Sequence, residues 1–426
     1  MSPRSPAVPA LEPNSLAYGL HAAARVVAEV LAGRSLAEGL PAWIDAGARP
    51  AVQDFVYSSL RQYGRGDFLL GRLLDRPLAE EEVRALLLMA LHRLESRPES
   101  AHTTVDQAVN AAGALAGGRR KALVNAVLRS FQREREALLA AADADDTATG
   151  RHPPWWLDRL RQAYPEKWES VVVAGNRPPP MALRVNLRRG TVAAYAAELL
   201  ARDIVSRPWG EAGLILDKPV PVERLPHFAA GRASVQDPGA QRAAALLDPA
   251  PGSRVLDACA APGGKAAHLL ERADLDLLAL DLKPARCRRV ESTLARLGLR
   301  ARVQVADAAR PEAWWDGLPF DAVLADVPCT ASGVVRRHPD AKWLRRESDV
   351  ARFAATQAHL LDALWRVVKP GGKLLYATCS IFPEENGAQV EAFLARQASA
   401  RRGHEEQWLP CDDHDGFYYC LLEKLP

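Results

Sequence analysis

The first third of the chain has the hydrophobic periodicity of helices and no alternating pattern of a strand. Between residues 14 and 137, apolar side chains recur three or four positions apart, as in the run Leu16, Leu20, Ala23, Val27 and Leu31. Residues 83–94 repeat this spacing, and residues 122–131 form another amphipathic stretch. These runs predict a compact helical bundle.

From about residue 234 the pattern changes to short apolar runs that alternate with longer amphipathic ones. Strands are expected at residues 254–258, 277–281, 302–306, 320–325 and 373–377. Helices are expected between them, at residues 265–272, 284–297 and 350–368. Repeated strand–helix units predict an α/β fold with a doubly wound, mainly parallel sheet. Residues 417–422 are expected to add an edge strand.

The intervening region has a mixed pattern. Residues 138–154 are rich in Ala, Asp, Thr and Gly and are expected to form a linker or an exposed loop. Beyond them, strands are expected at residues 182–187 and 213–216, among helical segments. We therefore predict three domains: a helical domain at 1–140, a linker with a small α+β subdomain at 141–233, and a catalytic domain at 234–426.

Composition narrows the class of protein. Hydrophobic residues make up 48% and charged residues 25%, which is typical of a globular protein, and no apolar run approaches the length of a membrane span. The six cysteines form no Cys-x-x-Cys pair, so neither a disulfide framework nor a metal site is expected. We expect a cytoplasmic protein with free thiols and no membrane partner.

The low net charge limits where a nucleic acid could bind. The formal charge is only +3, so RNA or DNA would have to meet local clusters of basic residues. Such clusters occur at residues 119–121, 184–189 and 336–346. For any single cluster, a solvated surface is the better interpretation.

A glycine-containing loop follows the first predicted strand of the catalytic domain. Its residues are Cys259, Ala260, Ala261, Pro262, Gly263, Gly264 and Lys265, and Asp257 lies two positions before them. Ligands bind above this turn in doubly wound sheets, and glycines let the backbone approach them closely. The pattern is neither that of a dinucleotide-binding loop nor that of a P-loop.

Two acids extend this loop into a candidate cofactor site. Asp281 ends the second strand and is placed to accept hydrogen bonds from ribose hydroxyls, and Asp307 follows the third strand and is placed to bind an adenine amino group. Each acid alone is as well explained as a polar strand end. Together with the loop, they predict a site for S-adenosylmethionine.

Two cysteines follow later strands. Cys329 lies in the sequence Asp326-Val-Pro-Cys-Thr, and Cys379 in Thr-Cys-Ser. Carbon 5 of cytosine becomes reactive when a thiolate adds to carbon 6, which requires a thiol with thiolate character and a hydrogen bond at ring nitrogen 3. A second thiol or base assists the later loss of the carbon 5 proton. These two thiols, with Asp326 as acid or hydrogen-bond partner, predict methylation of cytosine at carbon 5.

Burial without chemistry is the competing interpretation for each cysteine, because buried thiols are common and mostly inert. We accept it for Cys287, Cys411 and Cys420, whereas Cys259 lies in the cofactor loop and is expected to contribute its backbone. The spacing leaves open which of Cys329 and Cys379 attacks the base.

These motifs resemble the NOL1/NOP2/Sun family of RNA (cytosine-5) methyltransferases over nearly the whole chain. Further signatures are Pro383-Glu-Glu-Asn386 and Asp415-Gly-Phe-Tyr418. The resemblance implies a Rossmann-like catalytic core in which Cys379 is the nucleophile and Cys329 assists product release. It also implies that the cofactor is held by Cys259 to Lys265, Asp281, Asp307 and Asp326, and by Arg286.

The N-terminal domain and the loop after Cys329 resemble one bacterial branch of this family. Residues 23–31, 54–61 and 123–129 look like the antitermination factor NusB, and the branch acts on 16S ribosomal RNA. The resemblance implies RNA contacts at Arg184, Asn186, Arg336, Arg337 and Lys342, and we expect a monomer. Three alternatives remain: a transfer RNA or 23S ribosomal RNA methyltransferase, a DNA methyltransferase that is less favoured because it lacks the paired Thr-Cys, and a non-catalytic RNA-binding protein.

Overall fold

A computed structural model describes residues 11–36 and 39–426 of the chain. The fold separates into two compact units. The helical unit ends at Arg177 and also contains Val335–Arg346, and the catalytic unit contains Pro178–Val334 and Glu347–Pro426.

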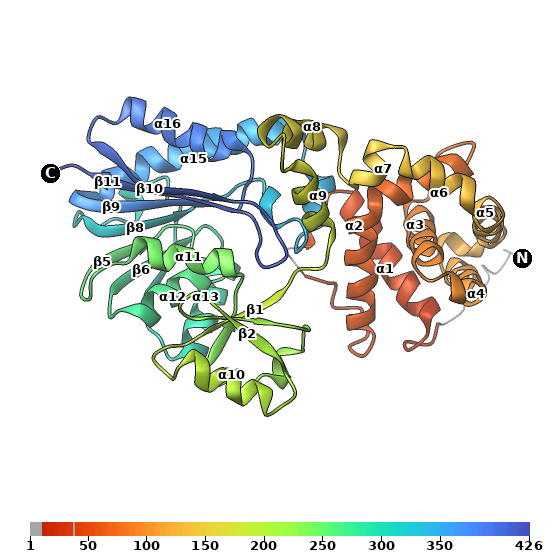
Figure 1. Cartoon of the computed structure of the whole chain (residues 1–426), viewed down its shortest axis with the longest axis horizontal. Coiled ribbons are helices and arrows are strands. Elements are labelled where there is room, and N and C mark those ends of the chain that lie inside the picture. Colours follow the sequence, from red (N-terminus) through yellow and green to blue (C-terminus); the bar gives the residue numbers. More distant parts are fainter. Residues whose placement is uncertain (1–10, 37–38) are drawn as a thin grey trace, which may run out of the picture. The chain divides into compact units, whose positions relative to one another are not determined.

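The helical unit is the predicted bundle (Figure 1). Its helices are α1 (Leu16–Leu31), α2 (Arg49–Leu73), α3 (Glu81–Ser96), α4 (Ala101–Gly113), α5 (Lys121–Arg133), α6 (Arg135–Asp143), α7 (Asp146–Gly150), α8 (Pro154–Ala163), α9 (Trp168–Asn176) and α14 (Asp340–Leu344). The side chain of Ser15 accepts a hydrogen bond from the Tyr18 N–H and so caps the start of α1. Apolar residues of α1, α3 and α4 form one buried core.

The prediction of a linker or an exposed loop at residues 138–154 is wrong. These residues continue α6 and form α7 and the start of α8. Asp145 caps α7 by accepting a hydrogen bond from the Ala148 N–H. Leu138, Ala142 and Ala148 pack in the core of the bundle, so tertiary burial overrides the local preference of Asp, Thr and Gly for turns.

The helical unit also contains a segment from the middle of the chain, Val335–Arg346, which we call the strap. Its Trp343 donates an indole hydrogen bond to the Leu60 carbonyl at 2.7 Å. The Asp340 carboxylate accepts hydrogen bonds from the Leu36 N–H at 2.9 Å and the Ser35 hydroxyl at 3.1 Å. The sequence prediction assigned the strap to the catalytic domain, and residues 141–177 to the small subdomain, whereas the structure places both segments in the helical unit.

A small antiparallel sheet begins the catalytic unit. Its strands are β1 (Met181–Val185), β2 (Ser206–Trp209), β3 (Gly213–Leu216) and β4 (Ala233–Val235), in the order β2-β3-β1-β4. One helix, α10 (Val192–Leu200), packs on this sheet through Tyr195 and Leu199. The two strands that the pattern predicts here correspond to β1 and β3.

The main sheet has seven strands in the order β10-β11-β9-β8-β5-β6-β7. They are β5 (Arg254–Asp257), β6 (Asp276–Asp281), β7 (Arg302–Val305), β8 (Phe320–Asp326), β9 (Val368–Thr378), β10 (Ala400–Trp408) and β11 (Phe417–Lys424). Strands β5 to β9 are parallel, while β11 pairs antiparallel with both β9 and β10. This confirms the predicted doubly wound, mainly parallel sheet.

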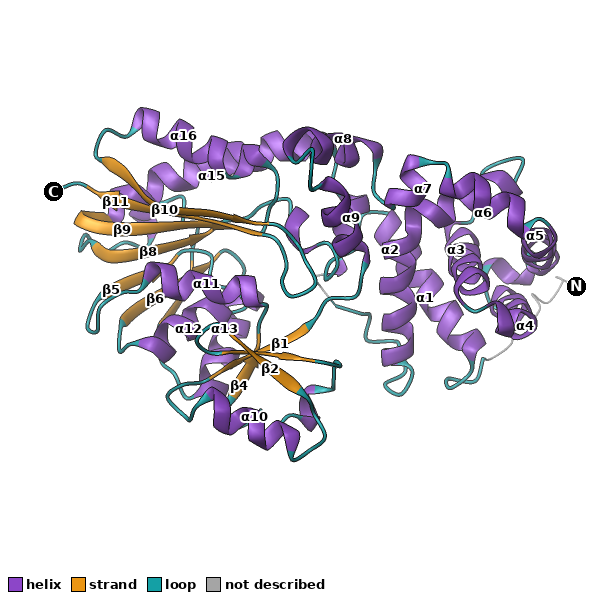
Figure 2. Cartoon of the chain, in the orientation of Figure 1, coloured by secondary structure: helices purple, strands orange, loops and turns teal. Residues whose placement is uncertain are grey.

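Helices cover both faces of the main sheet (Figure 2). They are α11 (Pro238–Leu247), α12 (Gly264–Arg272), α13 (Pro284–Leu297), α15 (Glu347–Val367) and α16 (Gly387–Arg396). One apolar core contains residues of α11, α12 and α13, and another contains residues of α15 and α16. Because β6 and β8 lie on opposite sides of β5, the strand order reverses there and the chain provides a ligand site at the carboxyl ends of these strands.

The prediction that residues 417–422 form an edge strand of the sheet is wrong. These residues form β11, which lies between β9 and β10, and the edge strand is β10. The sequence of β10, Ala-Arg-Arg-Gly-His-Glu-Glu-Gln-Trp, is too charged to indicate a strand. Charged residues of this kind are common on edge strands because they prevent association with other sheets.

Within residues 11–36 and 39–426, none of the helices has the combination of length and apolar character that a bilayer crossing needs.

Candidate active site

The glycine-containing loop joins the carboxyl end of β5 to α12. The N–H groups of Ala260 and Gly263 donate hydrogen bonds to the carbonyls of Leu280 (2.8 Å) and Ala260 (2.7 Å), which fixes the path of the loop. Gly263 has a φ of +98°, and a Cβ there would lie 3.1 Å from the Cα of Val290 in α13. Glycine is therefore required at this turn for both conformation and space, and the loop presents the start of α12 to a ligand.

The acid at the end of β6 lies against this loop. Asp281 is buried and accepts a hydrogen bond from the Ala261 N–H at 3.3 Å. Arg286 lies 3.5 Å from the Asp281 carboxylate and donates to the Ala261 carbonyl at 3.2 Å. Asp307 follows β7, the strand beside β6, and accepts from the Ala309 N–H at 3.0 Å. The structure thus brings the loop, Asp281 and Arg286 together and places Asp307 at the same edge of the sheet.

Asp257, the last residue of β5, is a buried carboxyl group. Only 1% of it is exposed, and neither carboxylate oxygen has a hydrogen-bond partner among the described residues. Burial, and then the negative charge of Asp326, raise the pKa of Asp257 to about 7. An acid in this state favours a positive charge or a hydrogen-bond donor beside it.

Lys265 connects the cofactor loop with the cysteine-bearing part of the site. Its ammonium group lies 2.6 Å from the carboxylate of Asp326, which ends β8. Burial acts to lower the pKa of Lys265, but the charge and hydrogen bond of Asp326 outweigh it and the pKa is raised. Lys265 therefore keeps its positive charge beside Asp326 at the end of the sheet.

Cys329 and Cys379 lie side by side. Their Sγ atoms are 3.3 Å apart, because β8 and β9 are parallel neighbours with Asp326 opposite Ala377. Cys329 is buried and Cys379 is half-buried. The hydrogen bond with Cys379, followed by burial, raises the pKa of the Cys329 thiol well above its ordinary value. A raised pKa makes Cys329 a poor source of thiolate.

The remaining cysteines lie apart from this pair. Burial raises the pKa of Cys259 above its ordinary value. Cys287 and Cys420 are buried, and Cys411 is exposed. Their raised pKa values and positions agree with a packing role for Cys287 and Cys420.

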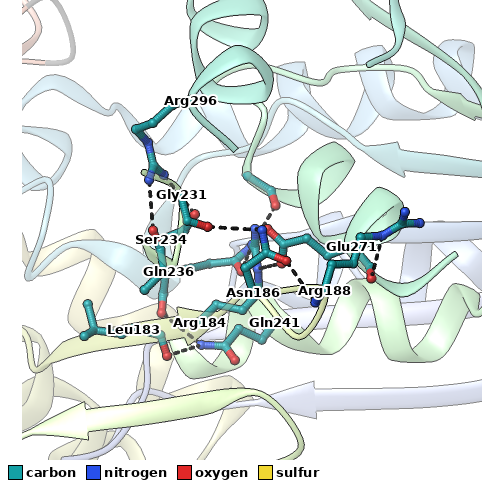
Figure 3. Close-up of polar contacts among 12 residues, drawn as sticks. Leu183, Arg184, Asn186, Arg188, Gly231, Ser234, Gln236, Gln241, Glu271 and Arg296 are labelled. Atoms are coloured by element: carbon teal, nitrogen blue, oxygen red, sulfur yellow. Dashed lines mark hydrogen bonds and ion pairs between the residues drawn. The ribbon is translucent and has the colours of Figure 1, made fainter. Parts of the chain in front are cut away.

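Two of the residues predicted to contact RNA lie in the interior of the catalytic unit instead (Figure 3). Arg184 is 0% exposed and makes a two-pronged ion pair with Glu271 of α12, with two N–O distances of 2.8 Å. It also donates to the Gly264 carbonyl at 2.8 Å and to the Gln236 side chain. Asn186, 1% exposed, donates to the Gly231 carbonyl at 3.1 Å. We correct the prediction: Arg184 fastens the small sheet to α12, whereas Asn186 links two segments within the small subdomain.

Arg336 and Lys342 of the strap are also buried, so we correct the prediction that they contact RNA. Lys342 donates hydrogen bonds to the carbonyls of Arg61 and Arg151 and to the side chain of Asn176, at 2.9–3.2 Å. Burial, and then the charges of Arg61 and Arg151, lower the pKa of Lys342 well below its ordinary value. Arg337 is half-buried, and its contact with RNA stays a prediction.

Comparison with known proteins identifies the family. Residues 244–423 match the family model described as 16S rRNA methyltransferase RsmB/F, residues 152–223 match the ferredoxin-like domain of the same proteins, and residues 21–133 match the NusB family. The chain is 44% identical to the ribosomal RNA small subunit methyltransferase B of Vibrio cholerae, over 92% of this chain and 94% of the relative. It belongs to this methyltransferase family. The corresponding protein of Pseudomonas putida is 43% identical, over 95% of this chain and 98% of the relative.

Solved structures share the fold. The crystal structure of PH0851 aligns with 98% of this chain and 100% of its own, with a TM-score of 0.78 and 23% identity. A methyltransferase homologue from Pyrococcus horikoshii aligns with 63% of this chain and 94% of its own, with a TM-score of 0.56 and 27% identity. The fold of nearly the whole chain thus occurs in a solved structure.

The residues at the carboxyl edge fit the cofactor of this family, S-adenosylmethionine, which supplies an electrophilic methyl group on a positively charged sulfur. The buried carboxyl group of Asp257 has no side-chain hydrogen-bond partner among the described residues and would favour a nearby cation. Gly263 lets the loop turn closely against α13, because a Cβ there would lie 3.1 Å from the Val290 Cα. Cys259 to Lys265, Asp281, Asp307 and Arg286 would hold the cofactor here.

Replacing Asp257 with asparagine is expected to stabilise the protein, and more so at high pH. The native pKa of Asp257, about 7, lies above its ordinary value, so the native state holds this proton and its contribution to stability is lost as pH rises from about 4 to 7. The gain in free energy of unfolding should grow by roughly 2–4 kcal/mol between pH 4 and pH 8. Thermal unfolding measured across this range checks it. Asp217→Asn, at an exposed acid, is the matched control and should show no such trend.

Proposed function

We propose that the protein transfers the methyl group of S-adenosylmethionine to carbon 5 of one cytosine in 16S ribosomal RNA, through a covalent adduct between Cys379 and carbon 6 of the base. One observation carries the proposal. Two thiols lie 3.3 Å apart at the carboxyl edge of the sheet, where the Lys265–Asp326 pair joins them to the cofactor loop. A methyltransferase that acts on oxygen or on an amino group has no need of two adjacent thiols.

The proposed reaction uses each group in turn. The Cys379 thiolate forms a bond to carbon 6, and the electron pair of the carbon 5–carbon 6 double bond becomes available at carbon 5. Asp326 would hold the base through a hydrogen bond at its polar edge. Carbon 5 would then take the methyl group as its bond to the cofactor sulfur breaks, which leaves S-adenosylhomocysteine. A base would next accept the carbon 5 proton, the double bond would re-form and Cys379 would leave as thiolate. The base has to leave its stack to reach these groups.

The environments of the two thiols support assigning the attack to Cys379. The nucleophile must lose its proton easily and must reach the base. Cys329 is 8% exposed and has a raised pKa, whereas Cys379 is half-buried, so it is the more accessible of the two. Cys329 would then assist the release of Cys379, whose sulfur lies 3.3 Å from its own.

The substrate assignment rests on the relatives. The Vibrio cholerae and Pseudomonas putida proteins are both named as small-subunit ribosomal RNA methyltransferases and match almost the full length of this chain. The match of residues 21–133 to the NusB family favours this branch over transfer RNA or 23S ribosomal RNA methyltransferases. We further propose that the protein works as a monomer in the cytoplasm, where ribosomal RNA is modified.

The test uses purified protein, labelled S-adenosylmethionine and protein-free 16S ribosomal RNA, with the modified base mapped by bisulfite sequencing. We expect a single 5-methylcytosine. Signal only on transfer RNA or 23S ribosomal RNA would keep the chemistry and overturn the substrate. Methylation of an amino group or a ribose hydroxyl would overturn the chemistry.

A further inference from the structure

Glu385 is a fully buried carboxylate that contacts both the loop carrying Cys329 and the loop carrying Cys379. It ends the short 3-10 helix Pro383–Glu385 and is 0% exposed. Its oxygens accept hydrogen bonds from the Thr330 N–H (2.9 Å), the Thr330 hydroxyl (2.5 Å), the Ser380 hydroxyl (2.5 Å) and the Gln357 amide (3.1 Å). A carboxylate with four donors around it is well satisfied even without a counter-ion.

The donors come from both cysteine loops. Thr330 follows Cys329, and Ser380 follows Cys379. Ser332 extends the link, because its hydroxyl lies 2.9 Å from the Ser380 hydroxyl and 3.2 Å from that of Thr330. Gln357 of α15 also donates to the Pro328 carbonyl at 3.0 Å, just before Cys329. The residues that follow the two cysteines therefore both donate hydrogen bonds to the same carboxylate.

We propose that Glu385 is a positioning residue for the two-cysteine reaction: its carboxylate fastens the Cys329 loop to the Cys379 loop and so sets the separation of the two thiols. The inference rests on the proposed function for its catalytic consequence. Glu385 lies in the Pro-Glu-Glu-Asn segment, to which the resemblance assigns no role.

Electrostatics adds a second effect of the same carboxylate. Burial raises the pKa of Glu385, and the hydrogen bonds from Ser380 and Thr330 act against this rise. The pKa of Cys329 is raised by its hydrogen bond with Cys379, by burial, and then by the charges of Cys379 and Glu385. A negative charge at Glu385 thus helps to keep Cys329 in its thiol form.

Glu385→Gln is the test, because an amide has one acceptor oxygen where the carboxylate has two. The first measurement equilibrates the protein, without RNA, in a glutathione redox buffer. The two thiols lose two protons and two electrons to oxidised glutathione, which becomes two reduced glutathione molecules, and a Cys329–Cys379 disulfide forms. Its fraction is measured by mass spectrometry of the linked peptides. If Glu385→Gln loosens the two loops, the equilibrium constant for disulfide formation should fall by about tenfold. This constant measures the effective concentration of one thiol at the other.

The second measurement is methylation kinetics. Glu385→Gln should lower kcat by about 10- to 100-fold, because misplacement by about 1 Å has effects of this size, while KM for RNA stays within about twofold. Glu384→Gln is the matched control: it makes the same chemical change at the exposed neighbouring residue of the same short helix and should leave both readouts unchanged.

Equal results for the Glu385 and Glu384 variants in both measurements would overturn the proposal. If Glu385→Gln does not fold, Thr330→Val takes its place, since it removes one donor hydroxyl at nearly constant shape; an unchanged disulfide equilibrium and kcat in that variant also overturn it. A shifted disulfide equilibrium in a protein whose parent methylates no cytosine would support the positioning role and refute the proposed reaction instead.

Discussion

Replacing Cys379 with alanine is expected to abolish methylation, by at least about 10³-fold, while binding of S-adenosylmethionine survives. The variant lacks the sulfur that adds to carbon 6, and the cofactor loop contacts of Asp281 and Arg286 do not involve it. Isothermal titration with the cofactor and labelled-methyl transfer to 16S ribosomal RNA measure the two properties separately.

Cys329→Ala should behave differently and trap the enzyme on its RNA. Methyl transfer precedes the step that Cys329 assists, so the adduct between Cys379 and carbon 6 forms and then persists. A protein–RNA species stable to denaturing electrophoresis, absent from the Cys329→Ala/Cys379→Ala double variant, is the expected result. An inactive Cys329→Ala protein without such a species would contradict the division of roles.

Cys411→Ala provides the matched control for both variants. Cys411 is exposed, while the reacting pair is at the end of the main sheet. The same atom is removed, so a general effect of losing a thiol would appear in this variant too. We expect methylation close to that of the native protein and no trapped RNA.

The second large effect is expected for Arg184→Ala. This substitution leaves the Glu271 carboxylate, 3% exposed, as a buried charge without its cation, and such a change destabilises a protein by about 3–5 kcal/mol. It also removes a donor to the Gly264 carbonyl at the start of α12, so cofactor affinity should fall. Thermal unfolding gives the first effect, and hydrogen exchange in peptides of β1 shows whether the loss is local.

Two controls separate this structural role from RNA binding. Arg188→Ala removes a half-exposed arginine of the same cluster and should change stability by less than about 1 kcal/mol. Arg184→Met combined with Glu271→Leu removes both charges and should recover much of the stability lost. Weaker RNA binding by Arg184→Ala at unchanged stability would contradict our correction and restore the RNA contact.

Much of the fold was predictable because its signals are local. Helix α13 occupies the predicted residues, with Pro284 at its first turn and Gly298, at a φ of +72°, at its end. The central parallel strands β5, β6 and β8 contain runs of buried apolar residues, since helices cover both faces of the sheet, and so they stand out in the sequence. Strand β10 and helix α7 escaped prediction because burial or pairing with distant residues, rather than composition, holds them in place.

The sequence by itself determined the chemistry of the carboxyl edge: a glycine loop, three acids and two cysteines, each directly after a strand. Parallel strands bring such residues to one edge whatever the details of packing. Only the tertiary structure decided what the basic residues do. Arg184 and Lys342 have the sequence signature of surface cations, but each has distant oxygen partners, Glu271 for one and the Arg151 carbonyl for the other, that make burial possible. Charge is visible in a sequence, whereas the partner that compensates it 87 or 191 positions away is not.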